Sequence, residues 1–320
     1  MLIWIIDEEW DNYKIEEKVI LDKIPNCEIK YSGLDFKKDL DTVGGLADAV
    51  ICQINIPMSG EVIDRLTNCK VISVYGAGYD KVDVGYAKQK GIKVTNVSSY
   101  CVDDVSDYVI SAMYRYNKML SGYNNGLKNG LWGAQAVERK IHRLSSQKLF
   151  IAGFGKIGRE IAKKAKALGM SVMFFDPYVS EESADEMGVQ KVSLEDGLAS
   201  GDFLSLNMKL TGDTQKLITL KELKLMKPEA YLINASRGGV IEEDDLMKAV
   251  NEGIISGATL DVVSVEPPPE NLEILHCNNI FVTPHISYLS EDSLNELQRS
   301  AAENAVGILT GETVRDIVNN

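Results

Sequence analysis

The sequence predicts an α/β protein with two doubly wound domains, each built on a parallel sheet covered by helices. Three observations lead to this fold class. The chain has 320 residues, which suits two domains. Short β-rich runs alternate with helical patterns over residues 1–100, and the alternation restarts at Lys148. The composition, with 45% hydrophobic and 25% charged residues, is that of a globular protein.

The first alternating region supplies five expected strands. They are the runs LIWII, CEIKY, AVICQI, KVISVYG and IKVTNV. Amphipathic segments such as EVIDRLTN and VDVGYAKQKG lie between them. The second of these ends at Gly91, the residue type that most often ends a helix. This alternation indicates a parallel sheet with helices on its faces.

The middle of the chain departs from the alternation. A helical pattern runs from Asp103 to about Met119, and the segment 121–146 that follows is glycine-rich and irregular. It still carries four large apolar residues, Leu127, Leu131, Trp132 and Ile141. Structureless loops of this length are uncommon inside a domain. Either the segment is disordered, or its apolar residues pack on another surface.

The second alternating region supplies six expected strands, the number in a complete dinucleotide-binding sheet. They are the runs KLFIAG, SVMFFD, DFLSLNM, AYLINAS, GATLDVV and NIFVT. A final helix is expected from apolar residues at helical spacing, Leu294, Leu297, Ala301, Ala305 and Ile308.

Charge and composition exclude several classes of partner. The net charge of −13, without a compensating Lys/Arg cluster, argues against nucleic acid and anionic membrane surfaces. No apolar run approaches the roughly 20 residues of a membrane span. The five cysteines lack metal-type spacing, and their odd number and apolar surroundings predict reduced thiols in a cytoplasmic protein without a metal site.

A glycine pattern indicates a nucleotide cofactor. GFGKIG places Gly153, Gly155 and Gly158 between an expected strand and an expected helix, as in the Rossmann phosphate-binding turn. The next strand ends at Asp176, close to the position of the acid that binds the ribose hydroxyls. A carboxylate there repels a 2′-phosphate, so the sequence predicts NAD rather than NADP. The weaker alternative is that Asp176 only caps the turn before Pro177.

Three later strands end in residues that can carry chemistry. Arg237 follows INAS, Glu266 follows the strand that contains Asp261, and His285 follows NIFVT. These strand ends face the ligand crevice of an open α/β sheet. Arg237 could instead form a surface ion pair with the acids at 242–245, and Glu266 could belong to a rigid proline loop. The combination of all three at one edge favours a catalytic site.

These motifs resemble the D-isomer-specific 2-hydroxyacid dehydrogenase family over nearly the whole chain. The resemblance is carried by VYGAGYDKVD, VTNVSSYCVDDVSDY, GFGKIGREIAKKAKALGM, FFDPY, LMKPEAYLINASRGGVIEEDDL, GATLDVVSVEPPPE and TPHIS. Two segments, NVSSYCVDDVSDY and PHISYLSEDSLNEL, are most similar to the branch that contains the C-terminal-binding-protein-like dehydrogenases.

The resemblance implies a fold in which a Rossmann NAD-binding domain, 102–290, is inserted in a flavodoxin-like substrate domain, 1–101 and 291–320. It implies a homodimer joined through the cofactor domains, on which the 121–146 segment could dock. It implies that Arg237, Glu266 and His285 are catalytic. The implied substrate-binding residues are Tyr75, Gly76, Ala77, Gly78 and Arg237. The implied cofactor contacts are Gly153, Gly155, Lys156, Ile157, Gly158, Asp176, Asn207, Thr214, Ala235, Ser236, Arg237, Asp261 and His285, with Asp261 at the nicotinamide amide.

The activity implied is reversible reduction of a 2-oxo acid to a D-2-hydroxy acid by hydride transfer. His285 would donate the proton, Glu266 would orient the imidazole and favour its charged form, and Arg237 would hold the carboxylate and keto oxygen. Gln53 stands where phosphoglycerate-using members carry arginine, which argues against a phosphorylated substrate. The alternative is an NAD(H)-sensing, corepressor-like interaction protein with little turnover. Formate dehydrogenase is disfavoured, because that subfamily pairs its histidine with glutamine.

Overall fold

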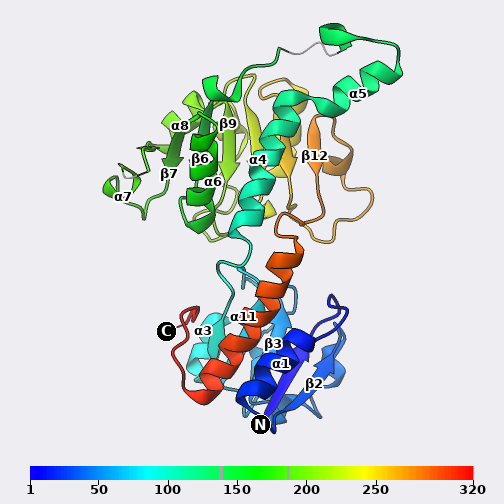
Figure 1. Cartoon of the computed structure of the whole chain (residues 1–320), viewed down its shortest axis with the longest axis vertical. Coiled ribbons are helices and arrows are strands. Elements are labelled where there is room, and N and C mark those ends of the chain that lie inside the picture. The colour runs from blue at the N-terminus through cyan, green and yellow to red at the C-terminus, as the bar shows by residue number, and fades with distance from the viewer. Residues whose placement is uncertain (137–139, 186, 320) are drawn as a thin grey trace. The chain divides into compact units, whose positions relative to one another are not determined.

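The computed structural model describes residues 1–136, 140–185 and 187–319. The chain divides into two compact units (Figure 1). Unit 1 comprises Met1–Tyr100 and Leu289–Asn320, and unit 2 comprises Cys101–Tyr288. The divisions expected from the sequence, after residues 101 and 290, lie one and two residues from these boundaries.

A five-stranded sheet forms the centre of unit 1, in the order β2-β1-β3-β4-β5, and all of its strand pairs are parallel. The strands are β1 Leu2–Ile6, β2 Glu28–Ser32, β3 Ala49–Gln53, β4 Val71–Tyr75 and β5 Lys93–Thr95. Each corresponds to one of the five runs expected from the sequence. The order is that of flavodoxin-like sheets, which confirms the predicted fold class for this unit.

Helices cover both faces of this sheet because successive strand residues point to opposite sides. Trp4 and Ile6 of β1 pack in one core with residues of two helices, α2 Gly60–Arg65 and α3 Val84–Gln89. Ile3 and Ile5 pack on the other face. There they meet α1 Lys14–Lys23 and the long C-terminal helix α11 Glu291–Thr310. Two short 3-10 helices, η1 Phe36–Lys38 and η2 Gly44–Leu46, complete the unit.

A seven-stranded parallel sheet forms the centre of unit 2, in the order β12-β11-β10-β9-β6-β7-β8. The strands are β6 Lys148–Ala152, β7 Ser171–Phe175, β8 Gln190–Lys191, β9 Phe203–Leu206, β10 Tyr231–Asn234, β11 Gly257–Leu260 and β12 Ile280–Val282. Counted from β6, this is the 3-2-1-4-5-6 order of dinucleotide-binding sheets with one further strand. The prediction of six strands was short by one, because β8 has two residues and no apolar run.

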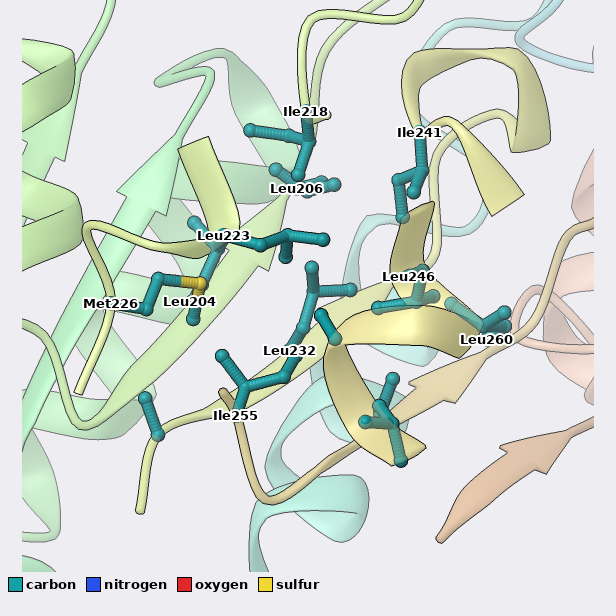
Figure 2. Packing of buried hydrophobic residues seen from close by; sticks show 14 of the residues in the cluster. Leu204, Leu206, Ile218, Leu223, Met226, Leu232, Ile241, Leu246, Ile255 and Leu260 are labelled. Carbon is teal, nitrogen blue, oxygen red and sulfur yellow. The ribbon is translucent and has the colours of Figure 1, made fainter. Parts of the chain in front are cut away.

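Two apolar layers hold the helices of unit 2 on its sheet. Leu149 and Ile151 face α4 Val102–Lys118 and α6 Lys156–Ala167. Phe150 and Ala152 face the opposite layer. Figure 2 shows part of that layer, where Leu204 of β9 lies beside Leu223 and Met226, and Leu232 of β10 lies beside Leu246. The helices of that layer are α8 Leu194–Ser200, α9 Leu220–Leu223 and α10 Glu243–Asn251.

The remaining elements of unit 2 are one nine-residue helix, α5, and several shorter helices. They are α5 Leu120–Lys128, α7 Glu182–Asp185, η3 Gly133–Ala136, η4 Leu144–Ser146, η5 Gly238–Val240 and η6 Glu273–His276. Within the described ranges, every helix is too short or too polar to cross a lipid bilayer.

The segment 121–146 differs from the irregular loop that the sequence predicts. Its first part is helix α5, and Figure 1 shows this helix extending away from the sheet of unit 2. Residues 137–139 lie outside the described residues. Several apolar side chains are exposed here, with exposed fractions of 53% for Leu127, 43% for Leu131 and 77% for Trp132. The sequence of this helix, LSGYNNGLK, is polar and contains glycine. A prediction based on apolar residues at helical spacing therefore missed it.

Candidate active site

Three neighbouring strands of unit 2 end at the same edge of the sheet and carry the expected catalytic residues. β10, β11 and β12 are adjacent and parallel, so their carboxyl ends lie side by side. Arg237 follows β10, Glu266 lies on the loop after β11, and His285 follows β12. The fold therefore gathers residues that are up to 48 positions apart in the sequence (285 − 237).

The imidazole of His285 is paired with the carboxylate of Glu266. The distance from Nδ1 of His285 to Oε2 of Glu266 is 2.8 Å, and the side chains are 27% and 36% exposed. The other carboxylate oxygen, Oε1, accepts from the backbone N–H of Val263 at 3.1 Å. Glu266 thus fixes one ring nitrogen of His285, and the N–H of Val263 fixes the carboxylate of Glu266. Nε2 of His285 is the ring nitrogen left for a ligand.

The pKa of Glu266 reflects this pairing. Burial alone would raise that pKa, but the hydrogen bond and the positive charge of His285 lower it. The Val263 N–H and the charge of Arg237 act in the same direction, so the pKa lies below its ordinary value. Glu266 is therefore a carboxylate at neutral pH, and its negative charge lies next to the imidazole of His285.

The backbone of His285 is held in an uncommon conformation. Its φ is 54°, in the left-handed region, which costs about 1–3 kcal/mol for a residue other than glycine. Such a conformation persists where surrounding bonds fix it. Here the N–H of His285 donates to the carbonyl oxygen of Asp261 at 2.8 Å, which ties the histidine to the neighbouring strand end.

Arg237 lies on a turn that its neighbours fix. The side-chain amide of Asn234 donates to the carbonyl oxygen of Arg237 at 3.0 Å, and its oxygen accepts from the N–H and hydroxyl of Ser236. A Cβ at Gly238 would lie 2.0 Å from the backbone of Val263, so only glycine lets the two loops approach. Nη1 of Arg237 donates to the carbonyl oxygen of Ser236 at 2.7 Å.

Three of the four acids near Arg237 in sequence have other partners. Glu242 pairs with Lys216, Glu243 accepts from the N–H and hydroxyl of Ser264, and Asp245 accepts from the N–H of Leu220. Glu243 therefore helps to hold the loop that carries Glu266, a role that the sequence did not indicate. Its only sequence signal was its place in an acidic run, which suggested an arginine partner instead.

The glycine turn after β6 fits a dinucleotide. Gly153 has a φ of 95°, and a Cβ there would lie 2.5 Å from the carbonyl oxygen of Asn207. A Cβ at Gly158 would lie 2.3 Å from the carbonyl oxygen of Gly153. By contrast, a Cβ at Gly155 would meet no atom within 4 Å, so this position faces open space. Packing thus requires the first and third glycines, and the second leaves room where the pattern places a pyrophosphate.

The start of α6 and the end of β7 complete this turn. Gly155 is the N-cap of α6 and provides no side-chain cap, and the helix begins with Lys156 and Ile157 at the end where helical N–H groups can bind a phosphate. Oδ2 of Asp176 accepts from the N–H of Phe154 at 2.8 Å, and Oδ1 accepts from the N–H of Tyr178 at 2.9 Å. Each oxygen has a lone pair left, so the carboxylate can still accept from ribose hydroxyls.

The family resemblance also implied cofactor contacts for Asn207, Thr214, Ala235 and Ser236. Asn207 lies against Gly153, and its buried Oδ1 has no partner among the described residues. An acceptor of this kind fits a donor from a bound nucleotide. The hydroxyl of Thr214 is used within its own turn, donating to the carbonyl oxygen of Lys209 at 2.6 Å. Ala235 and Ser236 follow β10 at the site edge.

The expected substrate loop lies in unit 1, directly after β4. Tyr75 is 1% exposed, and its hydroxyl donates to Oε1 of Glu16 at 2.8 Å, so its side chain belongs to the core of unit 1. The conformation of Gly76, with a φ of 150°, turns the chain out of the strand. Within the described ranges, the N–H groups of Ala77 and Gly78 donate to no protein acceptor, as an anion-binding loop requires.

Unit 2 thus combines a dinucleotide-binding sheet with an arginine and a carboxylate–imidazole pair at its carboxyl edge. A nucleotide-binding turn beside an arginine and a carboxylate–imidazole pair is typical of nicotinamide-dependent dehydrogenases.

Comparison with known proteins gives the family. Residues 110–287 match the family described as D-isomer specific 2-hydroxyacid dehydrogenase, NAD binding domain. The chain is 32% identical to the glyoxylate reductase of Thermococcus litoralis over 277 residues, which are 85% of this chain and 83% of that protein. It is 33% identical to the glycerate dehydrogenase of Methylorubrum extorquens over 279 residues, 85% and 86% of the two chains. The chain belongs to the D-isomer-specific 2-hydroxyacid dehydrogenase family.

The structural comparison agrees in fold. The crystal structure of D-lactate dehydrogenase from Aquifex aeolicus, complexed with NAD and lactic acid, superposes with a TM-score of 0.88. It covers 99% of both chains at 24% identity. The family and NAD as the cofactor are confirmed, and the resemblance to the C-terminal-binding-protein-like branch stays a prediction.

Proposed function

We propose that this protein interconverts a 2-oxo acid and a D-2-hydroxy acid, with NAD(H) as the hydride carrier. The observation that supports this best is the 2.8 Å pair of His285 and Glu266 on the strand ends beside Arg237. A histidine that must give and take a proton needs a fixed position and a partner that stabilises its charged form. The nicotinamide, when bound, supplies or accepts the hydride.

In the direction of reduction, negative charge develops on the keto oxygen of the substrate. His285, charged and oriented by Glu266, donates a proton from Nε2 to that oxygen. Arg237 binds the substrate carboxylate through its planar guanidinium and adds positive charge beside the keto oxygen. In oxidation, neutral His285 takes the hydroxyl proton, and the same carboxylate stabilises the imidazolium that forms.

The loop after β4 in unit 1 has N–H groups that suit an anion, those of Ala77 and Gly78. Asn96 fixes this loop by donating to the carbonyl oxygen of Ala77 at 2.7 Å. Gln53 argues against a phosphorylated substrate. It is 3% exposed, and its amide donates to Oδ1 of Asp7 at 2.7 Å, so it is a neutral group used within the core of unit 1.

A turnover assay tests the proposal. NADH oxidation is measured against glyoxylate, hydroxypyruvate, pyruvate and bulkier 2-oxo acids, and the product is resolved by chiral chromatography. We expect turnover of at least one small 2-oxo acid and a D product where the product is chiral. NADH binding without turnover of any 2-oxo acid would favour the alternative, a nucleotide-sensing interaction protein.

We expect NADH to be preferred over NADPH by at least about tenfold in kcat/KM, or about 1.4 kcal/mol. The reason is the carboxylate of Asp176 at the end of β7, which accepts ribose hydroxyls and repels a 2′-phosphate. Asp176→Asn keeps an acceptor for the N–H of Phe154 but removes the charge, so the preference should narrow. Steady-state kinetics with both cofactors measure this. Equal kcat/KM values for the wild type would refute the role of Asp176.

We also expect a homodimer joined through unit 2. Trp132, 77% exposed, and Leu127, 53% exposed, would be costly to leave in water. The same unit has a groove of about 610 Å³, lined in part by Tyr116, Met119 and Phe281. A second copy of the chain offers both the apolar residues and a surface to receive them.

Light scattering coupled to size-exclusion chromatography tests the dimer. Leu127→Ser combined with Trp132→Ser should shift the wild-type dimer toward monomer. Leu46→Ser is the matched control, since Leu46 is 60% exposed but lies in unit 1. A monomeric wild type, or a double variant that stays dimeric, would contradict this interface.

A further inference from the structure

The side chain of Asp261 is almost fully buried behind the catalytic histidine. It is 1% exposed and accepts three hydrogen bonds, all from residues 283–287, which we call the His285 strap. Oδ1 accepts from the hydroxyl of Thr283 at 2.7 Å and from the N–H of Ile286 at 2.8 Å, and Oδ2 accepts from the N–H of Ser287 at 2.8 Å. Asp261 therefore bonds the strap on both sides of His285.

The strap needs such bonds because of its place in the sheet. It continues from β12, which has three residues and lies at the edge of the sheet order. β11 is the one strand that pairs with β12 in the described part of the chain. Beyond Val282 the strap turns through His285, whose φ of 54° interrupts an extended course. Two backbone bonds remain to β11 and its continuation: Thr283 N–H to the carbonyl oxygen of Leu260, and His285 N–H to that of Asp261.

A further hydroxyl extends the network to helix α4. The hydroxyl oxygens of Tyr108 and Thr283 are 2.5 Å apart. Thr283 uses its only hydroxyl proton on the carboxylate of Asp261, which can only accept. Tyr108 must therefore donate to Thr283. Burial raises the pKa of Tyr108 to about 12, so the phenol keeps this proton at neutral pH.

We propose that Asp261, Thr283 and Tyr108 are positioning residues, which hold the His285 strap so that the imidazole stays on Glu266 and presents Nε2 to the substrate. The inference rests on the proposed function, in which His285 is the proton donor. Asp261 was expected only at the nicotinamide amide, and Tyr108 and Thr283 were not expected at the site. One lone pair of Oδ2 remains available in addition to the bond from Ser287, so both roles of Asp261 are chemically compatible.

Substitution of Thr283 separates positioning of the strap from cofactor binding. Thr283→Val keeps the shape of the side chain and the charge of Asp261, but removes the hydroxyl between Asp261 and Tyr108. Thr283→Ser restores the hydroxyl and is the matched control. Tyr108→Phe removes only the outer bond. Thermal unfolding and the Kd of NADH, from fluorescence titration, are measured for each variant.

A displaced imidazole should lower turnover and leave NADH binding intact. We expect Thr283→Val to reduce kcat on the order of 10- to 100-fold, because small displacements of a catalytic group have effects of this size. Thr283→Ser should recover most of the loss, and Tyr108→Phe should lie between the two. The ring nitrogen signals of His285 in ¹⁵N-labelled protein, assigned against His142 and His276, should change in Thr283→Val and return in Thr283→Ser.

The outcomes that would overturn the inference are specific. Thr283→Val with wild-type kcat and unchanged His285 signals would show that the strap does not depend on this bond. Equal losses in Thr283→Val and Thr283→Ser, or a loss confined to NADH affinity, would assign the residue to packing or to the cofactor. If the wild type turns over no 2-oxo acid, the proposed function fails, and the His285 signals of the Val and Ser variants still decide the positioning role.

Discussion

His285→Ala should lower kcat/KM for the 2-oxo acid by roughly 10²–10⁴, the usual contribution of a positioned acid or base. The substitution removes the proton donor and leaves the glycine turn after β6, so the Kd of NADH should change little. His142→Ala is the matched control, since His142 is exposed and lies away from the strand ends. Steady-state kinetics with fluorescence titration of NADH measure both quantities. A variant with near-normal turnover would remove His285 from the mechanism.

The pH dependence tests how Glu266 acts on this histidine. Reduction requires the imidazolium, so kcat/KM for the oxo acid should fall as rising pH deprotonates His285, whereas oxidation should improve over the same range. The interaction that lowers the pKa of Glu266 stabilises both charged partners, because the coupling is reciprocal. Glu266→Gln removes that charge and keeps a similar shape. The reductive limb should therefore move to lower pH, and an unmoved limb would mean that Glu266 does not stabilise the charged imidazole.

The elements that the sequence predicted best are the strands that are buried on both faces of a sheet. Buried parallel strands are nearly continuous apolar runs, and LIWII, KLFIAG and YLIN were visible for that reason. The edge that carries the candidate catalytic residues was also predictable, because the carboxyl ends of parallel strands meet at one edge. Arg237, Glu266 and His285 could thus be placed together from three separate segments.

The parts that the sequence missed depend on contacts without a local signal. β8 has two residues, and α5 is a polar helix that contains glycine. The side chain of Tyr75 lies in the core of unit 1, where its hydroxyl donates to Glu16, a residue 59 positions away in the sequence. The bonds of Asp261 to Thr283 and Ser287 join segments 22 and 26 residues apart, and no pattern along the chain encodes that distance.

Arg237→Lys should abolish most activity although the positive charge is kept. The guanidinium binds a carboxylate through two parallel N–H groups in a fixed plane, and an ammonium group is a point charge that cannot reproduce this contact. In addition, one N–H of Arg237 donates to the carbonyl oxygen of Ser236, which fixes the direction of the guanidinium group. We expect a loss on the order of 100-fold in kcat/KM for the oxo acid, about 2.7 kcal/mol.

The division of that loss between kcat and KM identifies the role of Arg237. In the proposed function the arginine binds the carboxylate and also stabilises charge on the keto oxygen. Both KM and kcat should therefore deteriorate, while the Kd of NADH should stay within about threefold. Arg299→Lys, an exposed position of α11, is the matched control. Kinetics with a 2-oxo acid and the corresponding 2-oxo amide add a second criterion. The wild type should strongly prefer the acid, and the lysine variant should lose much of that preference. If the variant keeps near-normal kcat/KM, or keeps the full preference for the acid, another group binds the carboxylate and Arg237 only supports the turn after β10.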